Sequence, residues 1–355
     1  MSETVDIPQD LDQERVVPAE ALEALLVKMF VKKGMFKVDA NVGAARLVEA
    51  DLRGIHSHGS RLAPKYLEAM DAGSIDARAQ VLTVQETPAI ALLDGGMGLG
   101  HVAATKGMAL AIEKAKEVGT GTVAVRRTQH LGAASLYSLM AAEAGMIGYT
   151  TTNTGPASVA AYGSKQPATA NNAFAWSIPL RAQAPFVLDM ACAVSSWGKV
   201  WTLSHYGEPI PAGWAYDEQG NETTDGFAAK TLLPAAGARG YGLAFISSVL
   251  SGVLAGGLMP IHRTSNFVAE GSEHFFYAID VARFGDIDKF YDELESTVAE
   301  IRALEPDTGF DQVRLPGELE AARAQKWRET GIPLHKGPFE KLEEVAREMK
   351  IELPW

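Results

Sequence analysis

The sequence predicts an α/β fold whose two chain ends are mainly helical, and two observations support this. Up to about residue 80, and again after Gly240, apolar residues recur at helical spacing. Between residues 81 and 226, short apolar runs of strand length alternate with helical stretches. Such alternation is typical of layered α/β proteins.

The N-terminal region is expected to form three helices. The first starts at Pro18, which suits a first helical turn, and ends at Gly34. One face of this helix is apolar and carries Leu22, Leu25, Leu26, Met29 and Phe30. Asp39 is a candidate cap for a second helix that runs to Leu52. A polar turn follows, and the third helix extends from Pro64 to Gly73.

The middle of the chain is expected to alternate strands with helices. The strands are predicted at Val81–Val84, Ala89–Leu93, Gly121–Val125, Met146–Asn153, Phe174–Pro179 and Phe186–Met190. The helices of this region are predicted at Gly107–Val118 and Ala134–Ala144. After the turn-rich segment 207–226, we expect a strand at Phe275–Asp280 and helices at Asp286–Leu304 and Pro338–Met349.

One apolar segment has two interpretations. Gly240–Ile261 carries no charged residue and is long enough to span a bilayer. Its small residues Ser248, Gly252 and Gly256 recur every four positions, as at helix-pairing faces in membranes. In an acidic chain without other such segments, we favour a buried helix of a soluble core. The small residues then predict close packing against another element, with a subunit interface as one option.

Composition excludes several classes of protein. Lys and Arg total 32 and Asp and Glu total 44, giving a formal net charge of −12. This charge is unfavourable for binding nucleic acid or an anionic membrane. The single cysteine, Cys192, cannot form an intrachain disulfide and fits a reducing compartment. The acidic N-terminus has no signal-peptide pattern, so we expect a cytoplasmic protein.

Two short motifs are misleading in their context. Gly119–Ala124 matches G-x-G-x-x-A, but it follows a predicted helix and enters a strand. The dinucleotide fingerprint needs the opposite order, so we interpret Gly119 as the end of a helix. Ser196–Lys199 matches S-x-x-K without the K-T-G and S-D-N elements that penicillin-binding chemistry needs. The histidines do not form H-E-x-x-H, and we expect no metal site.

Four polar sites remain at predicted turns, where catalytic groups often lie. They are His58, His130, Asp189, and the Asn153–Thr154 pair that ends a strand. Each one alone is more often structural than catalytic. Together they offer two imidazoles for proton transfer near pH 7 and a carboxylate that could orient one of them.

At these residues the sequence resembles the malate/L-lactate dehydrogenase family, which also includes ureidoglycolate and sulfolactate dehydrogenases, diketogulonate reductase and cyclic-imine reductases. The resemblance covers about residues 18–355 and keeps the family order of motifs. The matching stretches are ADLRGIHSHG (50–59), RRTQHLGAAS (126–135), TTNTGPASVAAYGS (151–164), FVLDMACAVSSWGK (186–199), IPAGWAYDEQGNETTD (210–225), ARGYGLA (238–244) and LPGELE (315–320).

The resemblance implies NAD- or NADP-dependent oxidation of small 2-hydroxy acids, or reduction of 2-oxo acids or imines. It implies a homodimer and a fold that is not of the Rossmann type. In that fold a helical domain is built from both chain ends, here residues 1–80 and 227–355. A central mixed-sheet α/β domain, residues 81–226, then binds the coenzyme.

Carried over residue by residue, the resemblance assigns roles to specific positions. His58 and His130 match the active-site histidines, and Tyr66 matches a substrate-contacting tyrosine. Ser57, in the Ser-His-Gly motif, and Arg61, one residue before the family's arginine, are assigned to the substrate site with it. Coenzyme contacts are implied for Asn153, Thr154, Leu188, Asp189, Met190, Arg239, Gly240, Gly317 and Glu318. The chain departs from the family at three points: Leu62 stands where the family has its carboxylate-binding arginine, Arg239 replaces a lysine, and Asn172 replaces a proline.

We therefore expect a histidine to give a proton to the heteroatom that receives negative charge during reduction. His58 is favoured and His130 is second, with Asp189 serving an imidazole or the coenzyme alone. Arg61 would hold the substrate carboxylate. Three alternatives stay open: a reductase of cyclic imino acids, a non-catalytic NAD(P)-binding homologue, and a membrane protein.

Overall fold

The computed structural model describes residues 13–264 and 270–355, so most of the acidic N-terminus lies outside the described residues. The α-helices are α1 Ala19–Lys32, α2 Lys37–Leu52, α3 Ala63–Asp71, α4 Gly100–Val118, α5 Ser135–Glu143, α6 Trp197–His205, α7 Ala238–Ser247, α8 Ile287–Arg302, α9 Glu318–Thr330 and α10 Lys336–Glu348. The longer strands are β1 Glu14–Val17, β2 Leu82–Glu86, β3 Ile90–Gly98, β4 Thr120–Thr128, β5 Met146–Asn153, β8 Phe174–Ile178, β9 Phe186–Met190, β13 Ser272–Asp280 and β14 Ile332–His335. The short strands are β6 Val159–Ala160, β7 Pro167–Thr169, β10 Ala215–Tyr216, β11 Glu222–Thr223 and β12 Thr231–Leu232.

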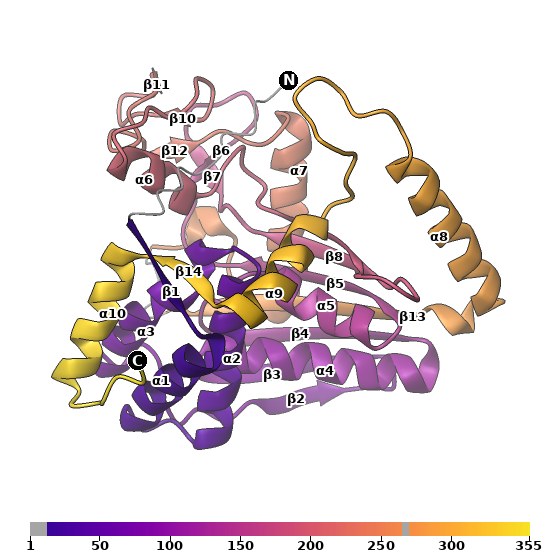
Figure 1. Ribbon diagram of the computed structural model, residues 1–355, viewed down its shortest axis with the longest axis horizontal. Helices are drawn as coiled ribbons and strands as arrows, with labels where there is room; N and C mark the ends of the chain where they lie inside the picture. The colour runs from indigo at the N-terminus through magenta and orange to yellow at the C-terminus, as the bar shows by residue number, and fades with distance from the viewer. Residues whose placement is uncertain (1–12, 265–269) are drawn as a thin grey trace.

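A seven-stranded mixed sheet forms the centre of the molecule, in the order β2-β3-β4-β13-β5-β8-β9 (Figure 1). Only β3 and β4 pair in parallel, whereas the other neighbours in this sheet pair antiparallel. A Rossmann sheet is mostly parallel, so the predicted mixed, non-Rossmann α/β fold is confirmed. Gly119 has a positive φ of 93° and ends α4, as predicted, rather than opening a coenzyme-binding helix.

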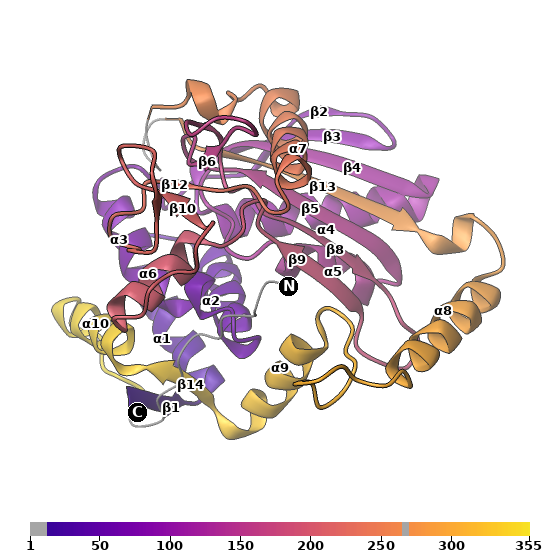
Figure 2. The ribbon, with the colours of Figure 1, turned by 90° about the horizontal axis from the view of Figure 1, so that it is seen from above.

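Helices cover both faces of this sheet. α4 and α5 pack on one face, and α7 lies over the other (Figure 2). Glycine permits the close approach of α4, because a Cβ at Gly107 would lie 2.7 Å from the ring of Phe276 in β13. On the opposite face, a Cβ at Gly252 would lie 2.5 Å from the amide nitrogen of Asn153 in β5. The sheet core is therefore set by small residues on the helices.

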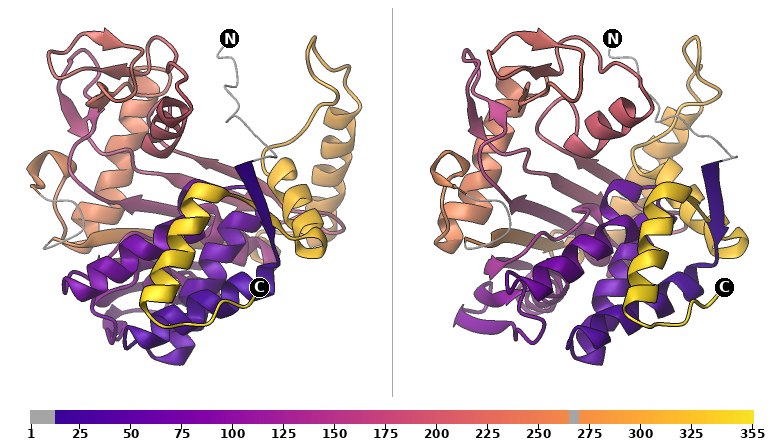
Figure 3. Two further views of the ribbon diagram at one scale, coloured as in Figure 1. Left: turned by 60° about the vertical axis from the view of Figure 1, so that its left-hand side comes forward. Right: turned by 90° about the vertical axis from the view of Figure 1, so that its left-hand side faces the viewer.

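The two ends of the chain share one hydrophobic core, which confirms the predicted helical unit built from both ends. Residues of α1 such as Leu25 and Phe30 belong to the same buried cluster as Phe339 and Leu342 of α10. β1 and β14 pair antiparallel and join the two ends directly. Figure 3 shows β1 and α10 next to each other at the surface of this helical layer.

A second, five-stranded sheet of short strands lies beside α6, in the order β11-β10-β12-β6-β7 (Figures 1 and 2). Its own small core includes Val159, Leu232 and, from α6, Val200 and Leu203. This layer matters for the site because it places α6 above the ends of the central strands.

The residue range 227–355, predicted as mainly helical, also supplies β13, which lies in the middle of the central sheet between β4 and β5. The predicted strands Met146–Asn153 and Phe186–Met190 agree with β5 and β9 to the residue. α4 begins at Gly100, seven positions before the expected start, and α6, α9 and β14 were not expected.

The apolar segment after Gly240 differs from the expected buried helix. Its small side chains, including Ser248 and Gly252, are buried against the sheet as expected. Its opposite face exposes Leu243, Phe245, Ile246, Val249, Val253 and Leu254. The run Ala238–Ala255 is long and apolar enough to cross a membrane by length and composition alone, and 39% of it is buried. One large apolar face of this chain is therefore uncovered.

Candidate functional site

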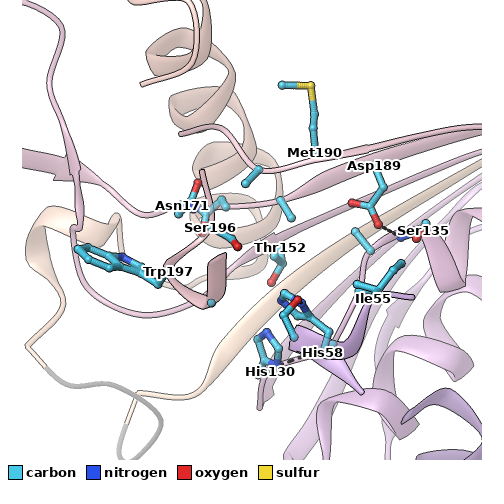
Figure 4. A pocket seen from close by; sticks show the side chains of 18 of the residues that line it. Ile55, His58, His130, Ser135, Thr152, Asn171, Asp189, Met190, Ser196 and Trp197 are labelled. Atoms are coloured by element: carbon cyan, nitrogen blue, oxygen red, sulfur yellow. Dashed lines mark hydrogen bonds between the residues drawn. The ribbon is translucent and has the colours of Figure 1, made fainter. Parts of the chain in front are cut away.

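A cavity of about 1280 Å³ lies where the helical layer, the central sheet and the α6 layer meet. Its wall takes in the turn before α3, the loop between β4 and α5, the ends of β5 and β9, and the start of α6 (Figure 4). The segment 314–320 closes it from the C-terminal part of the chain. The volume exceeds the roughly 300–1,000 Å³ typical of a small-molecule site, which leaves room for two ligands together.

Two histidines face each other in this cavity. The rings of His58 and His130 stack with their centroids 5.4 Å apart (Figure 4). Ser57 Oγ lies 2.8 Å from Nδ1 of His58. Nδ1 of His130 accepts the backbone N–H of Gly132 at 3.3 Å and lies 2.9 Å from the hydroxyl of Tyr66. The predicted residues Ser57, His58, Tyr66 and His130 are therefore brought together.

Both imidazoles of this pair are neutral at pH 7. Burial, reinforced by the nearby Arg61 guanidinium, lowers the pKa of His58 to about 4. Burial and the neighbouring His58 hold the pKa of His130 well below its usual value. A neutral imidazole accepts a proton, so the pair is prepared for a base role before any ligand binds.

The turn that carries His58 is held by a buried carboxylate at the end of α2. Asp51 accepts the backbone N–H of Ser60 at 2.8 Å and lies 2.9 Å from Nδ1 of His56. Gly59 passes so close that a Cβ there would lie 2.0 Å from Asp51 Oδ1. The Ser-His-Gly motif therefore needs a glycine at position 59, because a side chain there would collide with Asp51. The role of Asp51 was not predicted from the sequence.

A chain of hydroxyl and imidazole groups leads from the cavity into the sheet. Thr154 and Thr152 have their hydroxyl oxygens 2.9 Å apart, and Thr152 lies 2.9 Å from Nδ1 of His274. Nε2 of His274 donates to the backbone carbonyl of Gln129 at 3.0 Å, so Nδ1 is left to accept from Thr152. These contacts fix Thr152 and Thr154 at the floor of the cavity.

Asp189 lies beside Ser135 and apart from the two histidines in the cavity wall (Figure 4). Its carboxylate accepts the backbone N–H of Ser135, at the start of α5, at 2.9 Å. Partial desolvation in the cavity wall raises the pKa of this carboxyl, and the hydrogen bonds from Ser135 oppose that shift. The geometry places Asp189 with Leu188, Met190 and Gly317 in the cavity wall rather than beside an imidazole.

The cavity is basic although the chain is acidic. Its wall contains five Arg or Lys side chains and two carboxylates, namely Arg53, Arg61, Lys65, Lys230, Arg314, Asp189 and Glu320. Within the part of the chain that the structure describes, the side chain of Arg61 makes no hydrogen bond or ion pair. An arrangement of this charge suits anionic ligands such as a carboxylate or a pyrophosphate.

Four predicted coenzyme residues do not line the cavity. Asn153 is buried and donates to the carbonyl of Leu258 and to Glu273. Gly240 is buried beside the carbonyls of Ala235 and Cys192, and the preceding Arg239 is exposed. Glu318 pairs with Arg302 and accepts the backbone N–H of Leu315, so it shapes the segment that closes the cavity.

Several lining residues were not expected from the sequence. They include Thr152, Asn171, Trp197, Trp201, Phe227 and Lys230. Thr152 directly precedes the pair that ends β5, which was a usable signal. Trp197 lies inside the Ser196–Lys199 segment that we set aside, and nothing in its spacing indicated a cavity. Among residues 13–264 and 270–355, no cluster of three His, Cys, Asp or Glu side chains could hold a metal ion.

Comparison with known proteins shows which family this chain resembles in sequence and in structure. The sequence model of the malate/L-lactate dehydrogenase family matches residues 17–343. A malate dehydrogenase of Pyrococcus horikoshii is 35% identical over 95% of this chain and 96% of its own. A ureidoglycolate dehydrogenase (NAD(+)) of Escherichia coli K12 is 33% identical over 90% of this chain and 92% of its own. The solved structure of malate dehydrogenase from P. horikoshii OT3 superposes with a TM-score of 0.87 at 32% identity, covering 99% of both chains.

Proposed function

Because the chain belongs to the malate/L-lactate dehydrogenase family, we propose that it interconverts a small 2-hydroxy acid and its 2-oxo acid with NAD or NADP. The observation that carries this proposal is the neutral His58–His130 pair in a basic cavity that has room for two ligands. The three components that the reaction needs are a coenzyme site, an anchor for the acid and a base, and each can be assigned to residues of this cavity.

The residues present fit the coenzyme. The cavity wall is basic, which suits the negative charges of a dinucleotide. Gly317 lets the backbone lie close to β9, because a Cβ at this position would lie 2.7 Å from Cβ of Val187. We assign Thr154, Leu188, Asp189, Met190 and Gly317 to hold it, with the α/β segment 81–226 as the main coenzyme-binding part. When bound, NAD(P) supplies the site that accepts or gives the hydride.

The histidines supply the proton chemistry. In the oxidation direction, the C2–H bond breaks as a hydride leaves, the C2–O bond becomes double, and the hydroxyl proton goes to His58. We assign this role to His58 because its Nδ1–H can donate to Ser57, which leaves the lone pair on Nε2. Nδ1 of His130 already accepts from Gly132, so that ring is less able to take a proton.

The carboxylate of the acid is assigned to Arg61. Its guanidinium is exposed at the cavity, close enough to His58 to lower the pKa of that imidazole. Leu62, at the position where the family resemblance implied an arginine, is half-buried and also lines the cavity. Tyr66 and Ser57 orient the two imidazoles, so they serve the reaction through the histidines.

The test is a fluorescence titration of the purified protein with NADH and NADPH, followed by absorbance at 340 nm with a panel of 2-oxo acids and cyclic imines. Binding with turnover of a 2-oxo acid is expected. Turnover of cyclic imines alone would assign the reductase activity instead. Binding without turnover would indicate a non-catalytic homologue, and no binding of either coenzyme would overturn the proposal.

We also propose that the protein is a cytoplasmic homodimer. The apolar face of α7 and the following turns is exposed and includes Phe245, Ile246 and Val253. A second copy of the chain that packs on this face would remove it from water, which supports a dimer. The buried free thiol of Cys192 is consistent with a reducing compartment.

A further inference from the structure

A row of aromatic side chains follows one face of α6. Trp197 and Trp201, one helical turn apart, stack with ring centroids 5.9 Å apart and an interplanar angle of 29°. One further turn along, His205 packs against Phe227 at 5.6 Å. Trp197, Trp201 and Phe227 all line the cavity, and Trp201 and Phe227 are 50% and 60% exposed. We call these three side chains the aromatic wall.

The aromatic wall begins next to the reacting groups. A Cβ at Gly198 would lie 3.1 Å from Cβ of Ser57, so the first turn of α6 packs on the turn that carries His58. Figure 4 shows Trp197 on the far side of the histidines from Asp189 and Met190. Asp189 and Met190, two of the residues assigned to the coenzyme, therefore lie on one side of the histidines, and Trp197 of the aromatic wall lies on the other.

We propose that the aromatic wall binds the side chain of the substrate, and that this side chain is an aromatic ring. The substrate class is then the aryl-substituted 2-hydroxy and 2-oxo acids, such as phenyllactate and phenylpyruvate. This inference rests on the proposed function, since it names which acid the same site takes.

The contact surface at this end of the cavity favours a ring over a second anion. Large aromatic side chains that remain uncovered in a cavity gain free energy when a ligand covers them. Aromatic rings prefer offset or edge contacts at centroid distances of 4.5–7 Å, as Trp197 and Trp201 already adopt with each other. Leu62, beside Arg61, adds apolar surface where an arginine would have added charge.

A basic side chain at the same end offers the competing explanation. Lys230 lines the cavity near Phe227 and is exposed, so its ammonium could pair with a second acidic group of a dicarboxylate. An exposed ammonium stays hydrated, so an ion pair with it adds little to the affinity for the ligand. Covering a phenyl ring removes a large apolar surface from water, so we expect the aromatic contacts to contribute more to binding than the lysine does.

The experiment measures kcat/KM for reduction of phenylpyruvate, pyruvate and oxaloacetate with the preferred coenzyme. We expect phenylpyruvate to exceed both of the others by about 10- to 100-fold, the ratio that burial of one ring provides. Trp197→Ala should remove most of that advantage, so that the ratio of kcat/KM for phenylpyruvate to that for pyruvate falls towards one. Trp197→Phe should keep the preference for phenylpyruvate. Phe284→Ala, which removes an exposed ring outside the cavity wall, is the matched control.

Other outcomes separate this inference from the proposed function. A preference for oxaloacetate that Lys230→Met abolishes would overturn the aromatic assignment while leaving the dehydrogenase activity intact. Weaker NADH or NADPH binding in Trp197→Ala, with the order of acids unchanged, would assign the wall to the coenzyme and also overturn it. Absence of turnover with every acid would instead contradict the proposed function. Should Trp197→Ala not fold, by circular dichroism, Trp201→Ala at the exposed end of the wall takes its place.

Discussion

The imidazole of His58 has a depressed pKa because two independent features disfavour its charge. It is enclosed in the cavity, and the Arg61 guanidinium adds a positive charge nearby. A bound carboxylate would neutralise that guanidinium and remove one of the two effects. Substrate binding is therefore coupled to the basicity of the group that must take the proton.

The first prediction concerns pH dependence. Oxidation needs neutral His58, and with a pKa near 4 this form predominates throughout the neutral range. We expect kcat/KM for oxidation to stay level from pH 8 down to about pH 5, and kcat/KM for reduction, which needs protonated His58, to fall about tenfold per pH unit as pH rises from about 5 to 8. Steady-state profiles in both directions test this. An acid limb of oxidation near pH 6.5 would show that His58 has an ordinary pKa.

The second prediction separates the two histidines. His58→Gln should lower kcat by about 10²–10⁴ and leave the Kd of NADH nearly unchanged, because the ring acts on the transferred proton. His130→Gln should cost less, since its Nδ1 is already a hydrogen-bond acceptor. Equal losses in the two variants, with equal pH profiles, would contradict the assignment of the base to His58.

Among the site residues, sequence reasoning brought together His58, His130, Tyr66 and Arg61, which all line one cavity. For His58 and His130 the usable signal was a polar residue at a turn between regular elements, whereas Tyr66 and Arg61 were named from the family resemblance alone. Trp197 gave no such signal, because an aromatic residue at helical spacing is most often part of a core. Its exposure to a cavity depends on how α6 packs on Ser57, which is a tertiary contact that no local pattern encodes.

At the scale of elements, the turn between α2 and α3 depends on one carboxylate. Asp51 ends α2, is buried, and accepts the backbone of Ser60 on the far side of His58. The position of His58 relative to His130 is therefore fixed by α2 rather than by the loop itself.

The third prediction tests that dependence. Gly59→Ala would place a Cβ 2.0 Å from Asp51 Oδ1, so the turn must move. We expect kcat/KM to fall about 100-fold, since a displacement of about 1 Å has that effect on a reacting group. Gly285→Ala is the matched control, because its Cβ would meet nothing within 4 Å. Wild-type kcat/KM in Gly59→Ala would show that the turn tolerates the shift.

Helices and strands were predicted well where one face is apolar and where packing against neighbouring elements does not determine their ends. β9 is a mostly apolar run, β5 begins after Gly145 and ends at Asn153, and the ends of both strands were predicted to the residue. The first turn of α4 contains Gly100, whose low helix propensity hid the true start. Gly100 is needed there because a Cβ would lie 2.0 Å from the carbonyl oxygen of Gln129. The position of β13 between β4 and β5 is a long-range pairing that the order of elements cannot reveal.

At the scale of the whole molecule, buried histidines affect stability. Burial lowers the pKa of four of them, His58, His101, His130 and His274. Below pH 6.5 the unfolded chain binds protons at these rings that the folded chain does not bind. Stability is therefore lost as pH falls from about 6.5 towards 4. Glu273, whose pKa burial raises to about 7, has the opposite effect and offsets part of this loss.

The fourth prediction follows from that balance. The free energy of unfolding, from urea titrations at pH 7.5 and pH 5.0, should decrease at the lower pH, by up to about 1.4 kcal/mol per pH unit for each uncompensated histidine. His101→Leu should reduce the decrease, because both of its ring nitrogens lack a hydrogen-bond partner within the described residues. An unchanged or higher stability at pH 5.0 would contradict this account.

The fifth prediction concerns assembly. Ile246→Glu and Val253→Glu place charge on the uncovered face of α7 and the following turn, and we expect them to convert a dimer into a monomer of 37.9 kDa. Light scattering after size exclusion measures this, with Leu304→Glu as an exposed apolar control elsewhere. A monomeric wild-type protein would contradict the proposed dimer.

The place of β13 has a consequence for how the chain is made. Synthesis runs from the N-terminus, so β4 and β5 are both complete some 120 residues before the strand that joins them, Ser272–Asp280, leaves the ribosome. During that interval each has an unpaired edge, and the β1–β14 pair waits for residues 332–335. Unpaired edges are prone to aggregate in a nascent chain. Folding of the central sheet is therefore expected to finish only after β13 has left the ribosome.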